Sequence, residues 1–141
     1  MKIAIGSDHA GYLYKEEVIK YLKEKGHSVI DFGTHSEESC DYPTFGKEVG
    51  YCVAKNEADL GIVICATGEG IMISANKVPG VRCGLAYNND VSRLMRRHNG
   101  CNVIAFGAKE MPSKAVFRRI DIFLKTKPAK GRHLRRRNAI E

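Results

Sequence analysis

The sequence lacks the features that mark membrane, exported and metal-binding proteins. Its longest apolar runs, such as Leu60–Ala66, are far too short to cross a bilayer. The opening Met-Lys-Ile-Ala-Ile shows no signal-peptide pattern of basic, apolar and small-residue regions. The five cysteines are odd in number and have no C-x-x-C spacing, and neither H-E-x-x-H nor paired Cys/His ligands occur. We therefore expect a cytoplasmic protein with reduced thiols, no metal, no cofactor and no membrane partner.

Size and charge set further bounds. The 141 residues are 43% hydrophobic and 28% charged, which is typical of one soluble domain covering residues 1–141. The net charge of +7 is concentrated between Lys125 and Arg137, a stretch with no acidic residue. Such a basic segment, at about residues 126–141, can bind nucleic acid, a phosphorylated metabolite or only solvent. Composition alone leaves these alternatives open.

Short β-branched runs alternate with longer amphipathic stretches along the chain. We expect strands at Lys2–Gly6, Ser28–Phe32, Leu60–Ala66, Val81–Ala86 and Asn102–Gly107. We expect helices at Tyr12–Lys25, Pro43–Asn56, Ile71–Lys77, Asn89–His98 and Ser113–Lys125, and a basic one from about Arg132. This alternation predicts an α/β fold, a three-layer αβα sandwich around a Rossmann-like, mainly parallel five-stranded sheet. The continuous apolarity of Leu60–Ala66 indicates a strand covered on both faces.

Reactive side chains cluster near the ends of the expected strands. Ligands of open α/β sheets bind beyond the carboxyl ends of the strands. We expect that edge to gather the groups found at Ser7-Asp8-His9, at Cys65–Gly70 and at His98-Asn99.

The loop that follows the third expected strand fits no common phosphate-binding motif. A dinucleotide loop needs a third glycine where Ile73 stands, and a Walker A loop needs Gly-Lys-Ser/Thr where Gly70-Ile71-Met72 stands. A cysteine-phosphatase loop would place an arginine at Ile71. What remains is a thiol, Cys65, beside glycine amides and a helix N-terminus that can bind an anion. Such a thiol can act as a nucleophile or a base, and the alternative is a simple packed cysteine.

Longer motifs resemble the ribose-5-phosphate isomerase B family, which also contains galactose-6-phosphate and allose-6-phosphate isomerases. The similarity follows nearly the whole chain in order. Its motifs are Gly6-Ser7-Asp8-His9-Ala10-Gly11, Asp31-Phe32-Gly33-Thr34, Asp41-Tyr42-Pro43, Ile64–Ile71, Ala75-Asn76-Lys77, Arg97-His98-Asn99 and Gly131-Arg132-His133.

This resemblance implies an aldose–ketose isomerase that interconverts ribose 5-phosphate and ribulose 5-phosphate through a cis-enediolate, without a metal. It implies a homodimer, with a tetramer as the alternative, whose active site lies at the subunit interface. Cys65 corresponds to the base, Thr67 and the loop Ala66–Gly70 to the enediolate cradle, and His98 to the acid/base that opens the sugar ring. The remaining substrate and phosphate contacts correspond to Asp8, His9, Tyr42, Asn99, Lys109, Arg132 and Arg136.

The chain departs from the family pattern at three positions. Ala66 stands where glycine is common, and Lys109 where an arginine often binds phosphate, so that the charge is kept but the planar fork is lost. Glu69 occupies a position that is more often uncharged. Some members use a glutamate base, but theirs aligns with Ile71, so we keep Cys65 as the base. We expect Glu69 to point to solvent or to a basic neighbour.

Other functions have weaker support. A sugar-phosphate-binding module without activity would lack Cys65 or His98, and both are present. A nucleic-acid-binding protein would interleave its basic residues with aromatics, and Lys125–Arg137 has no aromatic side chain except His133. Within the isomerases, the His98-Asn99 pair favours ribose 5-phosphate over galactose 6-phosphate, and allose 6-phosphate stays open.

Overall fold

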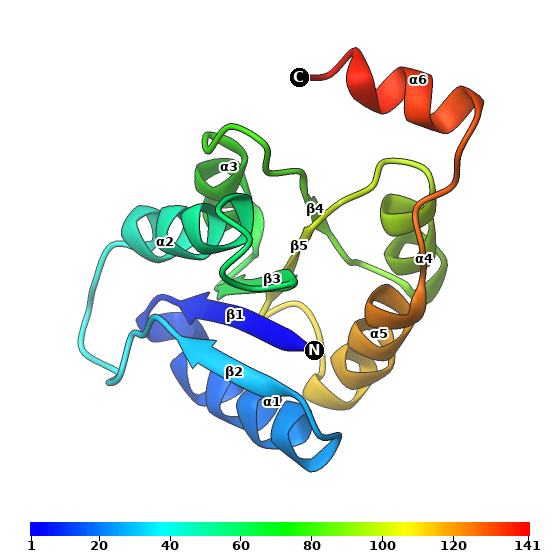
Figure 1. Cartoon of the computed structure of the whole chain (residues 1–141). Helices are drawn as coiled ribbons and strands as arrows, with labels where there is room; N and C mark the ends of the chain where they lie inside the picture. Colours follow the sequence, from blue (N-terminus) through cyan, green and yellow to red (C-terminus); the bar gives the residue numbers. More distant parts are fainter.

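The alternating pattern of the sequence becomes an alternation of parallel strands and helices (Figure 1). The computed structural model describes all residues, 1–141. The strands are β1 (Lys2–Ser7), β2 (Ser28–Asp31), β3 (Leu60–Cys65), β4 (Cys83–Leu85) and β5 (Val103–Gly107). The helices are the 3-10 turn η1 (His9–Gly11), α1 (Tyr12–Glu24), α2 (Tyr42–Ala54), α3 (Glu69–Asn76), α4 (Asn89–Arg97), α5 (Ser113–Lys125) and α6 (Arg132–Asn138).

The sheet has the strand order β2-β1-β3-β5-β4, and every neighbouring pair is parallel. This confirms the predicted α/β class. The chain adds β2 on one side of β1 and β3 on the other, so the direction of winding reverses between β1 and β3. A crevice at the carboxyl ends of these two strands is the usual ligand site of such sheets.

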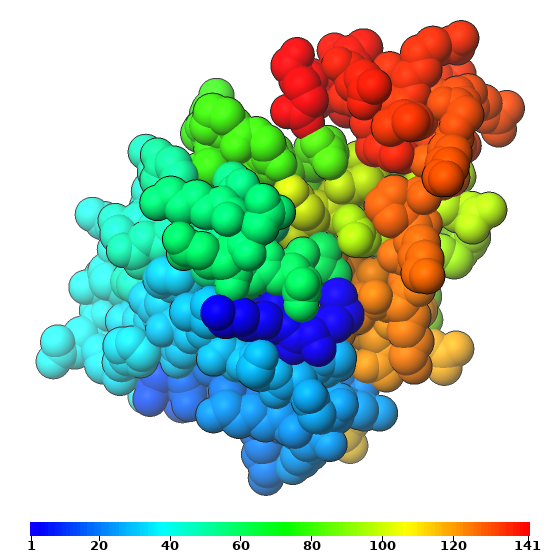
Figure 2. Space-filling model, viewed as in Figure 1, coloured from blue at the N-terminus to red at the C-terminus, as the bar shows by residue number.

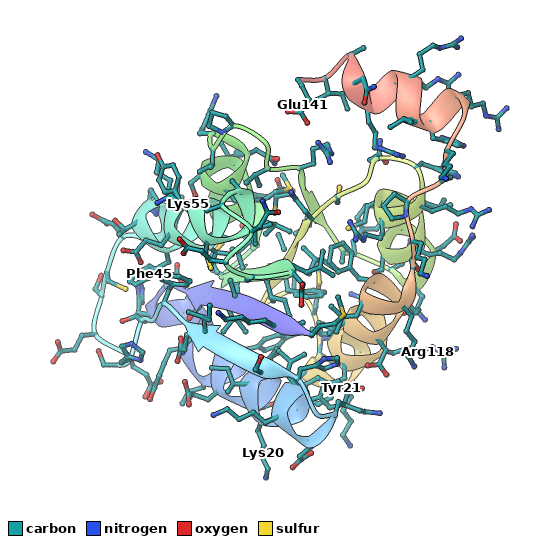
Figure 3. The ribbon with its side chains drawn as sticks, in the orientation of Figure 1. Lys20, Tyr21, Phe45, Lys55, Arg118 and Glu141 are labelled. Atoms are coloured by element: carbon teal, nitrogen blue, oxygen red, sulfur yellow. The ribbon has the colours of Figure 1, made fainter.

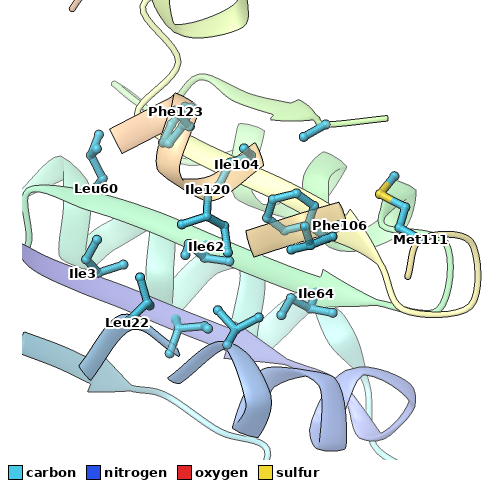
Figure 4. Close-up of a cluster of buried hydrophobic side chains, with 14 of the residues drawn as sticks. Ile3, Leu22, Leu60, Ile62, Ile64, Ile104, Phe106, Met111, Ile120 and Phe123 are labelled. Atoms are coloured by element: carbon cyan, nitrogen blue, oxygen red, sulfur yellow. The ribbon is translucent and has the colours of Figure 1, made fainter. Parts of the chain in front are cut away.

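Helices cover both faces of the sheet and enclose two apolar cores. Helices α1, α4 and α5 lie on one face, where Leu22, Ile120 and Phe123 pack against Ile62 and Phe106 of the sheet (Figure 4). Helices α2 and α3 cover the other face. All six residues of β3 are buried, as predicted for a strand covered on both sides.

The predicted boundaries differ from the observed ones by at most two residues, and two of these differences bear on the site. Helix α3 begins at Glu69 rather than Ile71, because Gly68 adopts a left-handed conformation that turns the chain directly into the helix. Strand β4 is confined to Cys83–Leu85, shorter than the predicted Val81–Ala86. The loop between β3 and α3 therefore consists only of residues 66–68.

A buried lysine joins the carboxyl ends of β1 and β2. Lys15 of α1 is fully buried, and its Nζ donates to both carboxylate oxygens of Asp31, at 2.8 and 2.7 Å. Asp31 Oδ1 accepts from the amide of Gly33 at 2.9 Å, and Gly33 O accepts from the amide of Ser7 at 2.7 Å. The charge on Lys15 thus holds the end of β2 against the end of β1.

The C-terminal segment lies apart from the layers. Figure 2 shows it as a lobe that stands out from the rest of the surface. The amide of Ala129 donates to Arg97 O at 2.7 Å, which joins the segment to the end of α4 before α6 begins. No helix of the chain is both long and apolar enough to cross a membrane.

Candidate functional site

Cys65 ends β3 at the carboxyl edge of the sheet, where it is 4% exposed. The backbone amide of Gly68 donates to Cys65 Sγ at 3.1 Å. Helix α3 starts one residue later, and its N-terminus carries a partial positive charge. A main-chain donor and the N-terminus of a helix therefore both lie beside the thiol.

Two loop glycines are needed because the loop is packed without spare room. Gly68 has φ of +87°, and a Cβ there would lie 2.5 Å from Leu85 Cδ1 and 2.8 Å from Phe106 C. A Cβ on Gly70 would lie 2.5 Å from Tyr42 Cζ. Tyr42, which was predicted as a substrate contact, thus lies against this loop.

The end of β1 supplies polar neighbours to the same edge. Asp8 is buried, its amide donates to Ile64 O at 3.3 Å, and its Oδ1 accepts from Gly11 N at 3.0 Å. His9 is oriented by the amide of Cys40, which donates to Nδ1 at 3.2 Å. These contacts leave one oxygen of Asp8 and Nε2 of His9 available for a ligand.

The exposed side chains of the loop surround its rigid backbone. Thr67 and Glu69 are exposed, and Thr67 Oγ1 accepts from the amide of Glu69 at 3.3 Å. The Glu69 carboxylate forms no ion pair within the chain and lies in solvent, which confirms the expected orientation. Ala66 is half-buried, and its carbonyl accepts from the amide of Lys109 at 3.0 Å. Lys109, with an exposed side chain, is thereby placed beside the loop.

His98 and Asn99 lie at the opposite edge, so the prediction that they join Cys65 within one chain was wrong. In the parallel sheet, each crossover helix runs back from the carboxyl edge to the amino edge. His98 caps the C-terminus of α4 and precedes β5, which pairs with β3 from Val103 at one end to Gly107 beside Cys65 at the other. That length of strand spans about 13 Å. Residues that precede a strand therefore cannot share an edge with residues that follow one.

Arginine side chains hold the segment that contains His98. Four consecutive carbonyls, from His98 to Cys101, each accept a hydrogen bond from a guanidinium group. Arg82 donates to Asn99 O and Gly100 O at 3.0 and 3.2 Å, and Arg96 donates to Cys101 O at 3.0 Å. Arg137 of α6 donates to His98 O at 3.3 Å and to Ala129 O at 2.9 Å. Arg82 also pairs with Glu141 at the chain end.

His98 stacks on a second histidine, His133, at the start of α6. The ring centroids lie 4.1 Å apart and the planes differ by 3°. Desolvation lowers the pKa of His133, and the nearby His98, Arg132, Arg136 and Arg137 lower it further. Arg132 and Arg136 are exposed on the same helix, and side chains with nitrogen tips surround α6 in Figure 3.

The sequence reasoning missed the arginines that fix this segment. It named Arg132 and Arg136 but not Arg82, Arg96 or Arg137. One available signal was the spacing of His133 and Arg137, which places both on one face of a helix. Both residues contact His98.

Three of the other cysteines, Cys52, Cys83 and Cys101, pack in the core. Burial raises the pKa of Cys101 to about 11 and also raises the pKa values of Cys83 and Cys52. These side chains stay protonated near neutral pH. No group of three or more His, Cys, Asp or Glu side chains gathers in the geometry of a metal site.

Neither edge forms a closed pocket that contains Cys65. None of the three cavities of the chain is lined by Cys65 or its loop. The largest, about 670 Å³, runs along the edge strand β4 and is lined by Val81, Leu85, Met95, Asn99 and Ile140 among others. The candidate site thus consists of two half-sites, one at each edge of the sheet.

Comparison with known proteins identifies the family. The model of the family described as Ribose/Galactose Isomerase matches residues 3–140. The chain is 42% identical over 139 residues to ribose-5-phosphate isomerase B of Escherichia coli, covering 99% of this chain and 93% of the relative. It is 43% identical over 127 residues to a galactose-6-phosphate isomerase subunit of Clostridium acetobutylicum, covering 90% of this chain and 73% of the relative.

A solved structure is similar throughout. The ribose-5-phosphate isomerase B of Clostridium thermocellum superposes with a TM-score of 0.98 at 47% identity, covering 99% of this chain and 95% of that chain. The match includes both half-sites, since it extends over nearly all residues. The chain therefore belongs to the Ribose/Galactose Isomerase family.

Proposed function

We propose that the protein is an aldose–ketose isomerase that interconverts ribose 5-phosphate and ribulose 5-phosphate. The observation that carries this function is the position of Cys65 beside the N-terminus of α3. Its Sγ accepts a hydrogen bond from the Gly68 amide at 3.1 Å. The thiolate takes the carbon-bound proton from C2 of the open-chain aldose and delivers it to C1, while the proton of the C2 hydroxyl passes to the C1 oxygen, so that the carbonyl moves from C1 to C2. The negative charge that develops on the enediolate oxygens is stabilised by the loop amides and Thr67.

The half-site at the amino edge supplies the remaining steps. Ribose 5-phosphate is mainly a closed furanose, so its ring must open before the proton on C2 becomes acidic. His98 is the acid/base for that step, with Asn99 beside it. Arg132 and Arg136 bind the phosphate, because a guanidinium group can donate two parallel hydrogen bonds to its oxygens. Asp8, His9, Tyr42 and Lys109 contact the substrate from the carboxyl edge.

The two half-sites come together in a homodimer, in which His98 of one subunit faces Cys65 of the other. Three observations support this assembly. The half-sites lie at opposite edges of one sheet, and no cavity of the single chain contains Cys65. The cavity along β4 gives each chain an apolar surface for a partner, and Ile73, Tyr87 and Ile140 are more than half exposed. Identical chains most commonly assemble as a two-fold dimer, in which both subunits contribute the same surface.

A mixing experiment tests the proposed dimer. Cys65→Ala and His98→Asn should each abolish conversion of ribose 5-phosphate. When the two variants exchange subunits, each mixed dimer regains one site with both groups. An equimolar mixture should recover about a quarter of the wild-type activity, because half of the dimers are mixed and one of their two sites is intact. If Cys65 and His98 of the same chain form a site, mixing restores nothing.

Isotope exchange separates the two chemical steps. Ribulose 5-phosphate cannot close a furanose ring, because its 5-hydroxyl carries the phosphate. Exchange of its C1 hydrogen with D₂O therefore needs the base but no ring opening. Cys65→Ala should lose this exchange, and His98→Asn should keep it. If Cys65→Ala still exchanges, Cys65 is not the base and Glu69 becomes the next candidate.

Hexose 6-phosphates are the alternative substrate class, because the relative from Clostridium acetobutylicum is named a galactose-6-phosphate isomerase subunit. Turnover of ribose 5-phosphate, allose 6-phosphate and galactose 6-phosphate should be compared with EDTA present. We expect the highest kcat/KM for ribose 5-phosphate. A higher value for either hexose would reassign the substrate and leave the isomerase chemistry unchanged.

We also assign residues 1–141 to one domain whose segment of about 126–141 serves the phosphate site and the dimer. The five unpaired cysteines suit a reducing compartment such as the cytoplasm.

A further inference from the structure

The ring of His98 is held by stacking and by no hydrogen bond. Its only ring partner within the chain is the parallel ring of His133, at 4.1 Å and 3°. The hydrogen bonds near His98 involve its backbone, from Arg137 Nη1 to its carbonyl and from its amide to Leu94 O. A side chain that transfers protons must be held in a defined plane, because the proton moves along the direction of the ring nitrogen's lone pair.

We propose that His133 is a positioning residue that holds the imidazole of His98 in the plane needed for opening the sugar ring. This inference rests on the proposed function, in which His98 performs that step. His133 itself touches no reacting atom, and its contribution passes through the stacked ring.

The charged groups that act on His133 are cationic. They are Arg132, Arg136 and Arg137 of its own helix α6. Arg96 and Arg97 end the neighbouring helix α4, and Arg82 donates to the carbonyl of Asn99. The acids of these elements are engaged elsewhere, since Asp90 bonds Arg93 at the far end of α4 and Glu141 pairs with Arg82.

His133 is the ring that stays neutral in this cationic setting. Its pKa is lowered by desolvation and by the charge of His98 among others. Two stacked imidazolium rings would repel each other, and a neutral His133 avoids that repulsion. A neutral His133 presents a π-face to His98 in both of its protonation states, and that face attracts the protonated form.

The step that depends on this geometry is the opening of the sugar ring, which moves one proton from the anomeric hydroxyl to the ring oxygen O4. Neutral His98 accepts the proton of the anomeric hydroxyl, the C1–O4 bond breaks with its electron pair on O4, and the C1 carbonyl forms. The imidazolium then returns the proton to O4. One ring plane must reach both oxygens, so rotation of His98 would slow the step without affecting proton transfer at C2.

Two substitutions and one control separate positioning from general damage. His133→Ala removes the stacking face, whereas His133→Phe keeps a flat aromatic ring that cannot titrate. Leu134→Ala changes a neighbouring exposed residue of the same helix. We expect His133→Ala to lower kcat for ribose 5-phosphate by about tenfold. KM and the C1 exchange of ribulose 5-phosphate should stay as in the wild type. His133→Phe should return kcat to within about twofold, since its ring restores the stack.

Three results would overturn the inference. The first is a wild-type kcat in His133→Ala. The second is an equal fall of conversion and C1 exchange, which indicates damage to the fold or dimer. The third is a raised KM alone, which indicates a phosphate contact. Failure of the proposed function has a different signature: His98→Asn would then convert ribose 5-phosphate normally, whatever the His133 variants do.

Discussion

The two edges of the sheet are built in different ways, although both contribute to the proposed site. At the carboxyl edge, the main chain does the positioning: the Gly68 amide bonds the sulfur of Cys65, and the amides of Ala108 and Lys109 bond the carbonyls of Cys65 and Ala66. At the amino edge, side chains do it, since guanidinium groups hold the carbonyls from His98 to Cys101.

The difference fits the roles that we propose for the two edges. An enediolate oxygen is best stabilised by donors that do not move, and main-chain amides in a tight turn meet that need. Phosphate and a ring-opening histidine require cations and a reachable imidazole, which long side chains on helix ends provide. The carboxyl edge should therefore respond to changes in backbone conformation, and the amino edge to loss of single side-chain hydrogen bonds.

The largest expected effect comes from Gly68→Ala. An added Cβ would overlap Leu85 and the backbone of Phe106, in a residue with φ of +87°. The loop must shift, and misplacing one oxyanion donor typically costs about 10²- to 10³-fold in kcat. We also expect a loss of about 1–3 kcal/mol of stability. Activity assays and urea unfolding measure both.

Gly26→Ala is the matched control for this change. Gly26 has φ of +83°, but nothing lies within 4 Å of its Cβ position. It should cost about 1 kcal/mol through backbone strain and leave kcat unchanged. If both variants keep full activity, the rigid-loop account of the carboxyl edge is wrong.

A smaller effect is expected from Arg137→Met at the amino edge. Arg137 is 9% exposed and donates to the carbonyls of His98 and Ala129. Methionine keeps much of the side-chain stem but makes neither bond, so we expect a loss of about 2 kcal/mol of stability. Conversion of ribose 5-phosphate should fall about tenfold as the histidine segment loosens.

Arg135→Met is the control for Arg137→Met. Arg135 is exposed on the same helix, so its loss removes the same charge but leaves the hydrogen bonds of Arg137 to the carbonyls of His98 and Ala129 intact. Exchange at C1 of ribulose 5-phosphate by Arg137→Met should match the wild type. An equal loss of exchange would mean that the two edges do not act separately.

The sequence predicted the fold and the place of the Cys65 loop between β3 and α3 well, because both depend on local signals. The spacing of apolar residues and the continuous apolar runs predicted the helices and strands, and the glycines predicted the loop after Cys65. The position of His98 was misjudged, because a residue just before a parallel strand lies at the amino edge, whereas Cys65 and its loop follow a strand. Arg82 and Arg137 are far apart in the chain and meet the 98–101 segment only after folding, so no local pattern could pair them.

The smallest effect is expected from Lys109→Arg, which tests whether the carboxyl edge also takes part in phosphate binding. The backbone of Lys109 is fixed by its amide bond to Ala66 O, and its side chain is exposed. Arginine would add a planar fork at a site that now offers one ammonium group. We expect KM for ribose 5-phosphate and the inhibition constant of inorganic phosphate to fall about threefold, which corresponds to about 0.6 kcal/mol. The value of kcat should not change.

Lys109→Gln provides the opposite change, because glutamine removes the charge and keeps a polar side chain. It should raise both constants, and added salt should reduce the difference between it and the wild type, since an exposed charge is screened. If neither variant alters phosphate inhibition, Lys109 makes no phosphate contact. Binding of the phosphate would then belong to the amino edge alone, through Arg132 and Arg136, and the two edges would differ in chemistry as sharply as they do in construction.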